Sequence, residues 1–233
     1  MVEDIAGFFD VKCIGIDVLA ADISKPWTDG NFGIIEINAG PGVFMHLAPA
    51  YGGSIDVPGL FIESHFHKNE YSRIPIIAGN NISQNFARML NDKLHEIKPD
   101  IYFSSLTEKG IHFNGEYFFK NEKHDENVKI ILRNPKTEIA LFTHNFDDIF
   151  DYGILHEGAD LIILDNPHYA EEKTLKEPLL PGGILIEVRD DEIIVSGEEP
   201  EHISIPVENA EDKDAKLLEV IEPYMEKLIV KYD

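Results

Sequence analysis

Two oxygen-bearing side chains, Glu36 and Asn38, stand two residues apart at the end of a short apolar run. Alternate residues of a β-strand point to the same face, so a strand that begins at Ile34 brings both side chains together. A carboxylate and an amide oxygen are hard ligands that suit Mg²⁺ carrying nucleotide phosphates. The spacing alone favours a simpler interpretation, which is an ordinary buried strand followed by a turn at Gly40-Pro41-Gly42.

A longer series of short motifs surrounds this pair and runs through the first fifty residues in a fixed order. The motifs are Gly15-Ile16-Asp17-Val18, Asp22-Ile23-Ser24-Lys25-Pro26, Glu36-Ile37-Asn38-Ala39-Gly40-Pro41-Gly42 and Met45-His46-Leu47-Ala48-Pro49. Together they resemble the end of the ATP-grasp domain in cyanophycin synthetases. The resemblance implies that Asp17, Glu36 and Asn38 form a metal triad, which would hold Mg²⁺ on ATP. One position departs from the family pattern, because Phe44 stands where an arginine usually precedes Met-His.

These side chains depend on a few elements near the start of the chain. We expect a helix over Val2–Phe9, a buried strand over Cys13–Leu19 that carries Asp17, and a second strand over Ile34–Asn38. The polar segment that follows carries His65 and His67, whose alternate spacing on a strand would suit a metal. Two histidines without a third ligand are more typical of a surface, so we assign no zinc site.

The chain beyond residue 70 resembles the Mur-ligase-like domain that follows ATP-grasp in the same family. A buried strand is expected at Ile74–Ala78, and Gly79–Asn85 has the outline of a phosphate-binding loop. The family loop reads Gly-Thr-Asn-Gly-Lys-Thr, whereas here Ile82 stands at the second glycine and Ser83 at the lysine. A β-branched side chain blocks close backbone approach, and loss of lysine removes the charge that holds phosphates. We therefore predict that this loop does not bind ATP in the usual way.

Later segments keep the family order with further departures. Thr143 stands at the position of the family's metal-binding glutamate, and we expect the C-terminal lobe of the Mur-like domain to be absent. Residues 182–195 are expected to form a hairpin, and residues 208–214 an acidic linker. The apolar spacing in Ala215–Lys231 predicts an amphipathic helix that packs in the core or in a dimer.

Composition limits the classes of function that the chain can serve. A hydrophobic content of 43% over 233 residues is typical of a folded protein, and a formal net charge of −23 disfavours nucleic acid and anionic membranes. The charge is compatible with a cationic substrate, although a solvated acidic surface explains it more simply. A single cysteine, Cys13, excludes an intrachain disulfide. No stretch resembles a membrane helix or a signal peptide, so we expect a cytoplasmic location.

The fold expected from these observations is α/β, with an ATP-grasp C-terminal remnant over residues 1–70 and a reduced, P-loop-type Mur-ligase-like domain over residues 71–233. The resemblance implies an ATP-dependent carboxylate–amine (peptide) ligase that uses Mg²⁺ and ATP on an aspartate- and arginine-containing peptide, with an inactive Mur-like domain. The nucleotide-covering lobe lies upstream of Met1 in the family. We therefore expect a fragment, a decayed gene or one half of a split enzyme, without turnover on its own. Its partner is expected to be an upstream ATP-grasp lobe or a second copy in a homo-oligomer.

Two other functions stay open from the residues. One is a non-catalytic pseudoenzyme that serves as a scaffold or oligomerisation module, which explains the altered Gly79–Asn85 loop better than a ligase does. It does not explain why all three members of the expected metal triad are present. The other is a stand-alone nucleotide-binding protein that uses the turn at Gly79.

Overall fold

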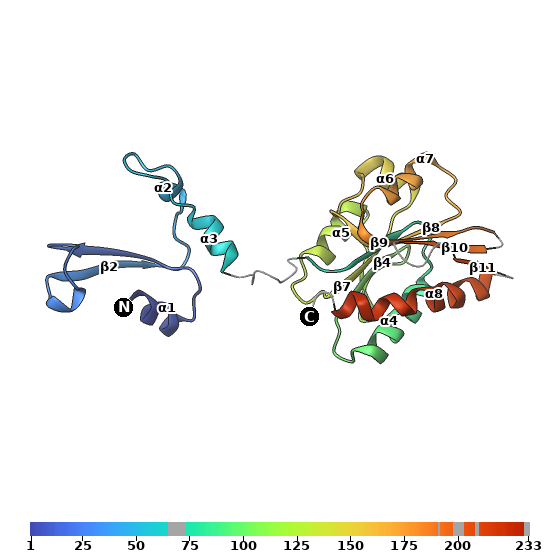
Figure 1. The fold of residues 1–233 in the computed structure, drawn as a ribbon, viewed down its shortest axis with the longest axis horizontal. Coiled ribbons are helices and arrows are strands. Elements are labelled where there is room, and N and C mark those ends of the chain that lie inside the picture. Colours follow the sequence, from blue (N-terminus) through green and yellow to red (C-terminus); the bar gives the residue numbers. More distant parts are fainter. Residues whose placement is uncertain (65–72, 191, 198–202, 208–209, 231–233) are drawn as a thin grey trace. The chain divides into compact units, whose positions relative to one another are not determined.

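The structure is a computed structural model that describes residues 1–64, 73–190, 192–197, 203–207 and 210–230. The chain divides into two compact units, Met1–Glu70 and Tyr71–Asp233, each drawn in Figure 1. The two histidines weighed as zinc ligands, His65 and His67, lie outside the described residues. None of the described helices has the length and hydropathy that a membrane span requires.

The first unit is built around a two-stranded antiparallel sheet. Its elements are α1 (Val2–Phe9), β1 (Gly15–Ala20), the 3-10 turn η1 (Trp27–Asp29), β2 (Phe32–Asn38), α2 (Phe44–Leu47) and α3 (Val57–Glu63). The expected helix and both expected strands are present, although β2 begins two residues earlier than the sequence indicated.

The prediction that these strands are buried is wrong. None of the described side chains of the first unit is buried, and Leu19 and Ile35 are 71% and 67% exposed. The physical reason is that, within residues 1–64, β1 and β2 form a ribbon of two strands, and no further layer there buries its faces. Ribbons of this kind are marginally stable alone. The apolar side chains of β2 therefore lie on a surface and join neither of the described hydrophobic cores.

The second unit contains a nine-stranded mixed sheet with the order β11-β10-β9-β8-β3-β7-β4-β5-β6. Its elements are β3 (Ile76–Gly79), α4 (Gln84–Ile97), β4 (Phe103–Thr107), β5 (Gly110–Phe113), β6 (Glu116–Phe119), α5 (His124–Leu132), β7 (Ile139–Thr143), α6 (Phe146–Tyr152), β8 (Ala159–Asp165), α7 (Ala170–Lys173), the 3-10 turn η2 (Thr174–Lys176), β9 (Leu179–Val188), β10 (Glu192–Ser196), β11 (Ile203–Pro206) and α8 (Ala210–Val230). The mixed α/β fold predicted from sequence is confirmed.

The central strands of this sheet, β4, β7, β3, β8 and β9, run parallel, and antiparallel strands extend both edges. β3 comes first along the chain and lies between β7 and β8, so the order of strands reverses beside it. Ligands of open α/β sheets bind outside the carboxyl ends of the strands at such a reversal. The turn after β3 is therefore the place where the fold would present a phosphate site.

Helices cover both faces of this sheet, as Figure 1 shows: α4 and α8 pack on one face and α5, α6 and α7 on the other. Successive side chains of each strand point to opposite faces of the sheet and so pack in two separate cores. Leu141 and Leu161 join the core under α4 and α8, whereas Phe142 and Ile162 join the core on the opposite face.

Three expectations for the C-terminal part are settled by these elements. The apolar stripe of α8 packs in the core, with Ile221 and Met225 fully buried. The predicted acidic linker over residues 208–214 is wrong from Ala210 onward, because α8 begins there. Acidic side chains are favoured in the first turn of a helix, where the backbone dipole is positive. The expected hairpin is confirmed by the antiparallel pairing of β9 with β10.

Candidate functional site

The ribbon of the first unit brings the three expected metal ligands to neighbouring positions. Asp17 of β1 stands directly opposite Glu36 of β2, and Asn38 stands opposite Gly15 at the next pair on the same face. Directly opposed residues of an antiparallel pair have Cβ atoms roughly 5 Å apart. The pairing of two strands thus adds a second carboxylate to the carboxylate and amide that lie along β2.

A local irregularity in β2 is part of this register. The pairing shifts between Asp17 and Val18, which pair with Glu36 and Ile34, so that Ile35 is the additional residue. Such a bulge re-aims the side chains beside it. The turn after Asn38 lies close to the start of β1, because a Cβ built on Gly15 would approach Pro41 Cβ to 2.7 Å. Only glycine at position 15 allows this turn to stay against the strand.

The electrostatic setting of the triad is that of an open acidic site. Asp17 and Glu36 are exposed and Asn38 is half-buried. Among the described residues, no hydrogen bond or ion pair is found for these three side chains. No group of three His, Cys, Asp or Glu residues suited to a metal occurs in the described part either. The donor set here is two carboxylates and one amide oxygen, which fits a hard divalent cation that keeps several waters.

In the second unit, the side chains of the turn after β3 make contacts within the protein. Ile82, at the family glycine position, is 5% exposed and packs in the core under α4. Ser83, at the family lysine position, is the N-cap of α4, and its Oγ accepts a hydrogen bond from the Phe86 N–H at 2.9 Å. Both residues that replace the phosphate-binding pair therefore serve the folding of α4.

A carboxylate of the same chain lies at the N-terminal end of α4. Asp214 Oδ2 accepts hydrogen bonds from Ser83 Oγ at 2.7 Å and from Asn85 Nδ2 at 2.9 Å. Helix N-termini favour negative charge, so Asp214 stands where an anion would bind. A phosphate at this place would meet a like charge that is 8% exposed. This arrangement does not favour a nucleotide site at the Gly79 turn.

The carboxyl ends of β3 and β8 are tied together by one amide side chain. Asn80 is fully buried; its Oδ1 accepts from the Asp165 N–H at 2.8 Å and its Nδ2 donates to the Asp165 carbonyl at 3.0 Å. The Asp165 side chain pairs with Lys213 Nζ at 2.6 Å. The polar side chains at the carboxyl ends of β3 and β8 therefore hydrogen-bond or form ion pairs with other groups of the protein.

Three buried histidines on the opposite face of the sheet were not anticipated from sequence. His124, the first residue of α5, contacts His144 after β7, with 2.8 Å between Nε2 and Nδ1. His144 in turn contacts His156 in the loop before β8, with 3.3 Å between their Nε2 atoms. Burial lowers the pKa of all three and lowers that of His156 to about 4. Their positions in the sequence show no periodicity that would have revealed this chain of contacts.

Comparison with known proteins gives one consistent relationship. No protein-family model matches the chain. The chain is 31% identical over 170 residues to cyanophycin synthetase of Geminocystis herdmanii, and 31% over 172 residues to that of Synechocystis sp.. Each match covers 71% of this chain and 19% of the relative, so the chain spans about a fifth of the length of these relatives. The resemblance seen in the motifs is confirmed, and over most of its own length the chain is similar to cyanophycin synthetases.

Proposed function

We propose that the first unit contributes the metal-holding part of an ATP-dependent carboxylate–amine ligase site, in which Asp17, Glu36 and Asn38 hold Mg²⁺ on ATP. The observation that carries the proposal is the direct cross-strand opposition of Asp17 and Glu36. Like charges directly opposite each other destabilise a pair of strands. A divalent cation between them converts this repulsion into attraction. The bound metal would offset the charge that develops during phosphoryl transfer.

The exposed apolar surface of the same unit supports a site that another stretch of polypeptide completes. Besides Leu19 and Ile35, the side chains of Ile23 and Phe44 are 83% and 75% exposed. Covering a large apolar side chain contributes about 1.5–3 kcal/mol. We propose that this surface receives an ATP-grasp lobe, and that the complete site joins an amino group to a carboxylate of an aspartate- and arginine-containing peptide. The isolated chain is expected to show no turnover.

Metal binding can be tested on the full chain with Mn²⁺, which favours the same hard oxygen ligands and broadens nearby NMR signals. We expect Mn²⁺ to broaden the amide signals of residues 15–18 and 36–38 first. Glu36→Gln should weaken the binding about tenfold, which corresponds to about 1.4 kcal/mol. Asp29→Asn is the matched control, because Asp29 is an exposed carboxylate of the same unit that lies outside the triad. Equal affinity of the two variants would reject the triad.

Ligase chemistry requires a second test in a complete assembly. When the chain is combined with an ATP-grasp lobe and shows ATP-dependent ligation, Glu36→Ala should abolish ADP release, and Asp29→Ala should leave it unchanged. Unchanged turnover of Glu36→Ala would rule out the assignment even if Mn²⁺ binds.

A second candidate is a non-catalytic scaffold or oligomerisation module. The observation that favours it is the placement of Asp214 and Ile82 at the turn after β3, which leaves a complete core without a phosphate site. The apolar surface of the first unit would then serve assembly alone. Light scattering over a range of concentrations tests this function. A strict monomer that also fails to associate with an ATP-grasp lobe would contradict it.

A further inference from the structure

The three buried histidines form one continuous line of polar contacts. Asp148 Oδ2 of α6 lies 3.4 Å from His124 Nδ1, and the line continues through His144 to His156. It ends where His156 Nδ1 lies 3.1 Å from the Gly158 carbonyl. His144 has no exposed surface, so its two ring nitrogens depend on the two other imidazoles.

When all three imidazoles are neutral, the Gly158 carbonyl determines which ring nitrogen of each imidazole carries the proton. A carbonyl only accepts, so His156 carries its proton on Nδ1 and offers a lone pair at Nε2. His144 must then donate from Nε2, which leaves its Nδ1 as an acceptor. His124 donates to that acceptor from its own Nε2. Every contact between the rings is satisfied by one choice of tautomers.

This set of tautomers leaves one unfavourable contact, at the Asp148 end of the line. The lone pair of His124 Nδ1 faces the Asp148 carboxylate, so two acceptors meet at 3.4 Å. One added proton on Nδ1 resolves the mismatch and changes no other contact. A proton added to His144 or His156 would instead set two donors against each other.

The surroundings of His124 determine how readily that proton is held. Burial lowers the pKa of His124, Asp148 and Asp125 raise it, and Lys120 lowers it. The N-terminal end of α5 also opposes a positive charge. Two further charged groups, Glu108 and Glu122, line the same small cavity as His124 and Lys120. Asp125 is itself paired with Lys129 at 2.6 Å, so the carboxylate that bears most directly on this imidazole is Asp148, 3.4 Å from Nδ1.

We propose that the Asp148–His124–His144–His156 line is a one-proton binding site, in which the proton is held by His124 against Asp148 and the tautomers of the other two histidines stay fixed. The site opens on the cavity lined by His124. Binding of the proton adds one positive charge to that cavity and joins the start of α5 to the first turn of α6 by an ion pair.

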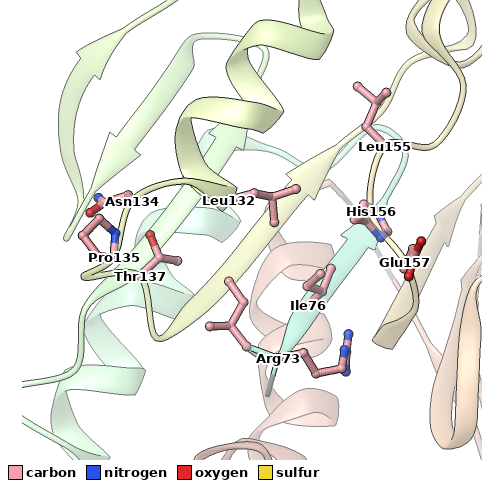
Figure 2. Close-up of a pocket in the computed structure, with 10 residues that line it drawn as sticks. Arg73, Ile76, Leu132, Asn134, Pro135, Thr137, Leu155, His156 and Glu157 are labelled. Atoms are coloured by element: carbon pink, nitrogen blue, oxygen red, sulfur yellow. The ribbon is translucent and has the colours of Figure 1, made fainter. Parts of the chain in front are cut away.

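The same geometry argues against a proton conduit. His156 lines a separate cavity of about 430 Å³ together with Arg73 and Leu132, as Figure 2 shows. Transfer from one cavity to the other would reverse all three tautomers and set His156 Nδ1, without its proton, against the Gly158 carbonyl. The line therefore stores a proton at one end and does not pass it to the other.

Long-range ¹H–¹⁵N NMR of the full chain tests this directly, because it reports the tautomer and the charge of each imidazole. On acidification we expect His124 to take up the first proton, with His144 still protonated at Nε2 and His156 at Nδ1. Asp148→Asn should move the His124 titration to lower pH. The variant keeps the helix cap, since an amide oxygen still accepts from the Asn145 N–H as Asp148 does at 3.0 Å.

Asp147→Asn is the matched control, because Asp147 is an exposed carboxylate in the same turn of α6. It should shift the His124 titration far less than Asp148→Asn. The inference is overturned if His144 or His156 titrates before His124, or if His156 carries its proton on Nε2. A common change of tautomer in all three rings would indicate a conduit and would also overturn it. Equal shifts in the two variants would remove Asp148 from the site.

Discussion

Acid should destabilise the second unit, and His156 allows the size of the effect to be calculated. Burial, and less strongly the charge of Arg73, lowers the pKa of His156 from 6.5 to about 4, while the contact with Gly158 opposes the shift. The folded protein therefore binds this proton less readily than the unfolded chain does. The stabilising contribution is complete above pH 6.5, and it is lost as the pH falls from 6.5 towards 4. From these two pKa values, the loss is about 1 kcal/mol at pH 5.5 and about 2–3 kcal/mol at pH 4.5.

The assay is urea unfolding followed by far-UV circular dichroism at a series of pH values between neutral and acid. His156→Gln should lose less stability on acidification than the wild type, by about 2–3 kcal/mol at pH 4.5. Ile76→Val is the control, because Ile76 is 4% exposed and lines the same cavity without a titrating group. It should cost about 0.5–1.5 kcal/mol at every pH. A pH dependence of His156→Gln identical to that of the wild type would refute the reasoning.

Three further predictions concern the carboxyl end of β3. Asn80→Ala should cost about 1–3 kcal/mol in urea unfolding, because the buried Asp165 N–H loses its acceptor. Asn81→Gly should cost less than about 1 kcal/mol, since Asn80 still donates to the Asp165 carbonyl and position 81 has a positive φ that glycine tolerates. Gly79→Ala should lower stability by about 3 kcal/mol in thermal unfolding, because its Cβ would collide with the Ile163 carbonyl oxygen. A loss below about 0.5 kcal/mol would show that β3 and β8 separate easily.

The sequence predicted the fold best where one local pattern decides the outcome. The continuous apolar run at β3 and the spacing of apolar residues in α8 each indicate a buried element, and both are buried. The start of α8 was missed because acidic residues are common both in linkers and in the first turn of a helix. Burial of β1 and β2 was predicted wrongly, since an apolar strand requires a second layer and the sequence of the strand does not state whether one exists.

The candidate site was predictable only in part, for reasons of geometry. The strand period places Glu36 and Asn38 on the same face, whereas Asp17 was assigned to the site only from the family resemblance. Its position opposite Glu36 depends on the register across the connection between β1 and β2 and on the bulge at Ile35. The histidine line joins residues from α5, from the end of β7 and from the loop before β8. Contacts of this kind arise from tertiary packing, so no local pattern reports them.

The two units differ in what they retain, and this difference bears on the function. The second unit has two complete cores, yet the turn where its fold would bind phosphate is filled by Ile82 and Asp214. The described residues of the first unit include no buried side chain, yet this unit holds two opposed carboxylates and an amide on one face. Selection for stability alone would remove the repulsion between Asp17 and Glu36, because either could be replaced on an exposed ribbon without loss of packing. We propose a bound cation as the reason for their opposition, and a covering polypeptide surface as the reason for the exposed ribbon around them. A scaffold would need the exposed apolar surface but not the opposed carboxylates, so the ligase proposal accounts for more of the molecule.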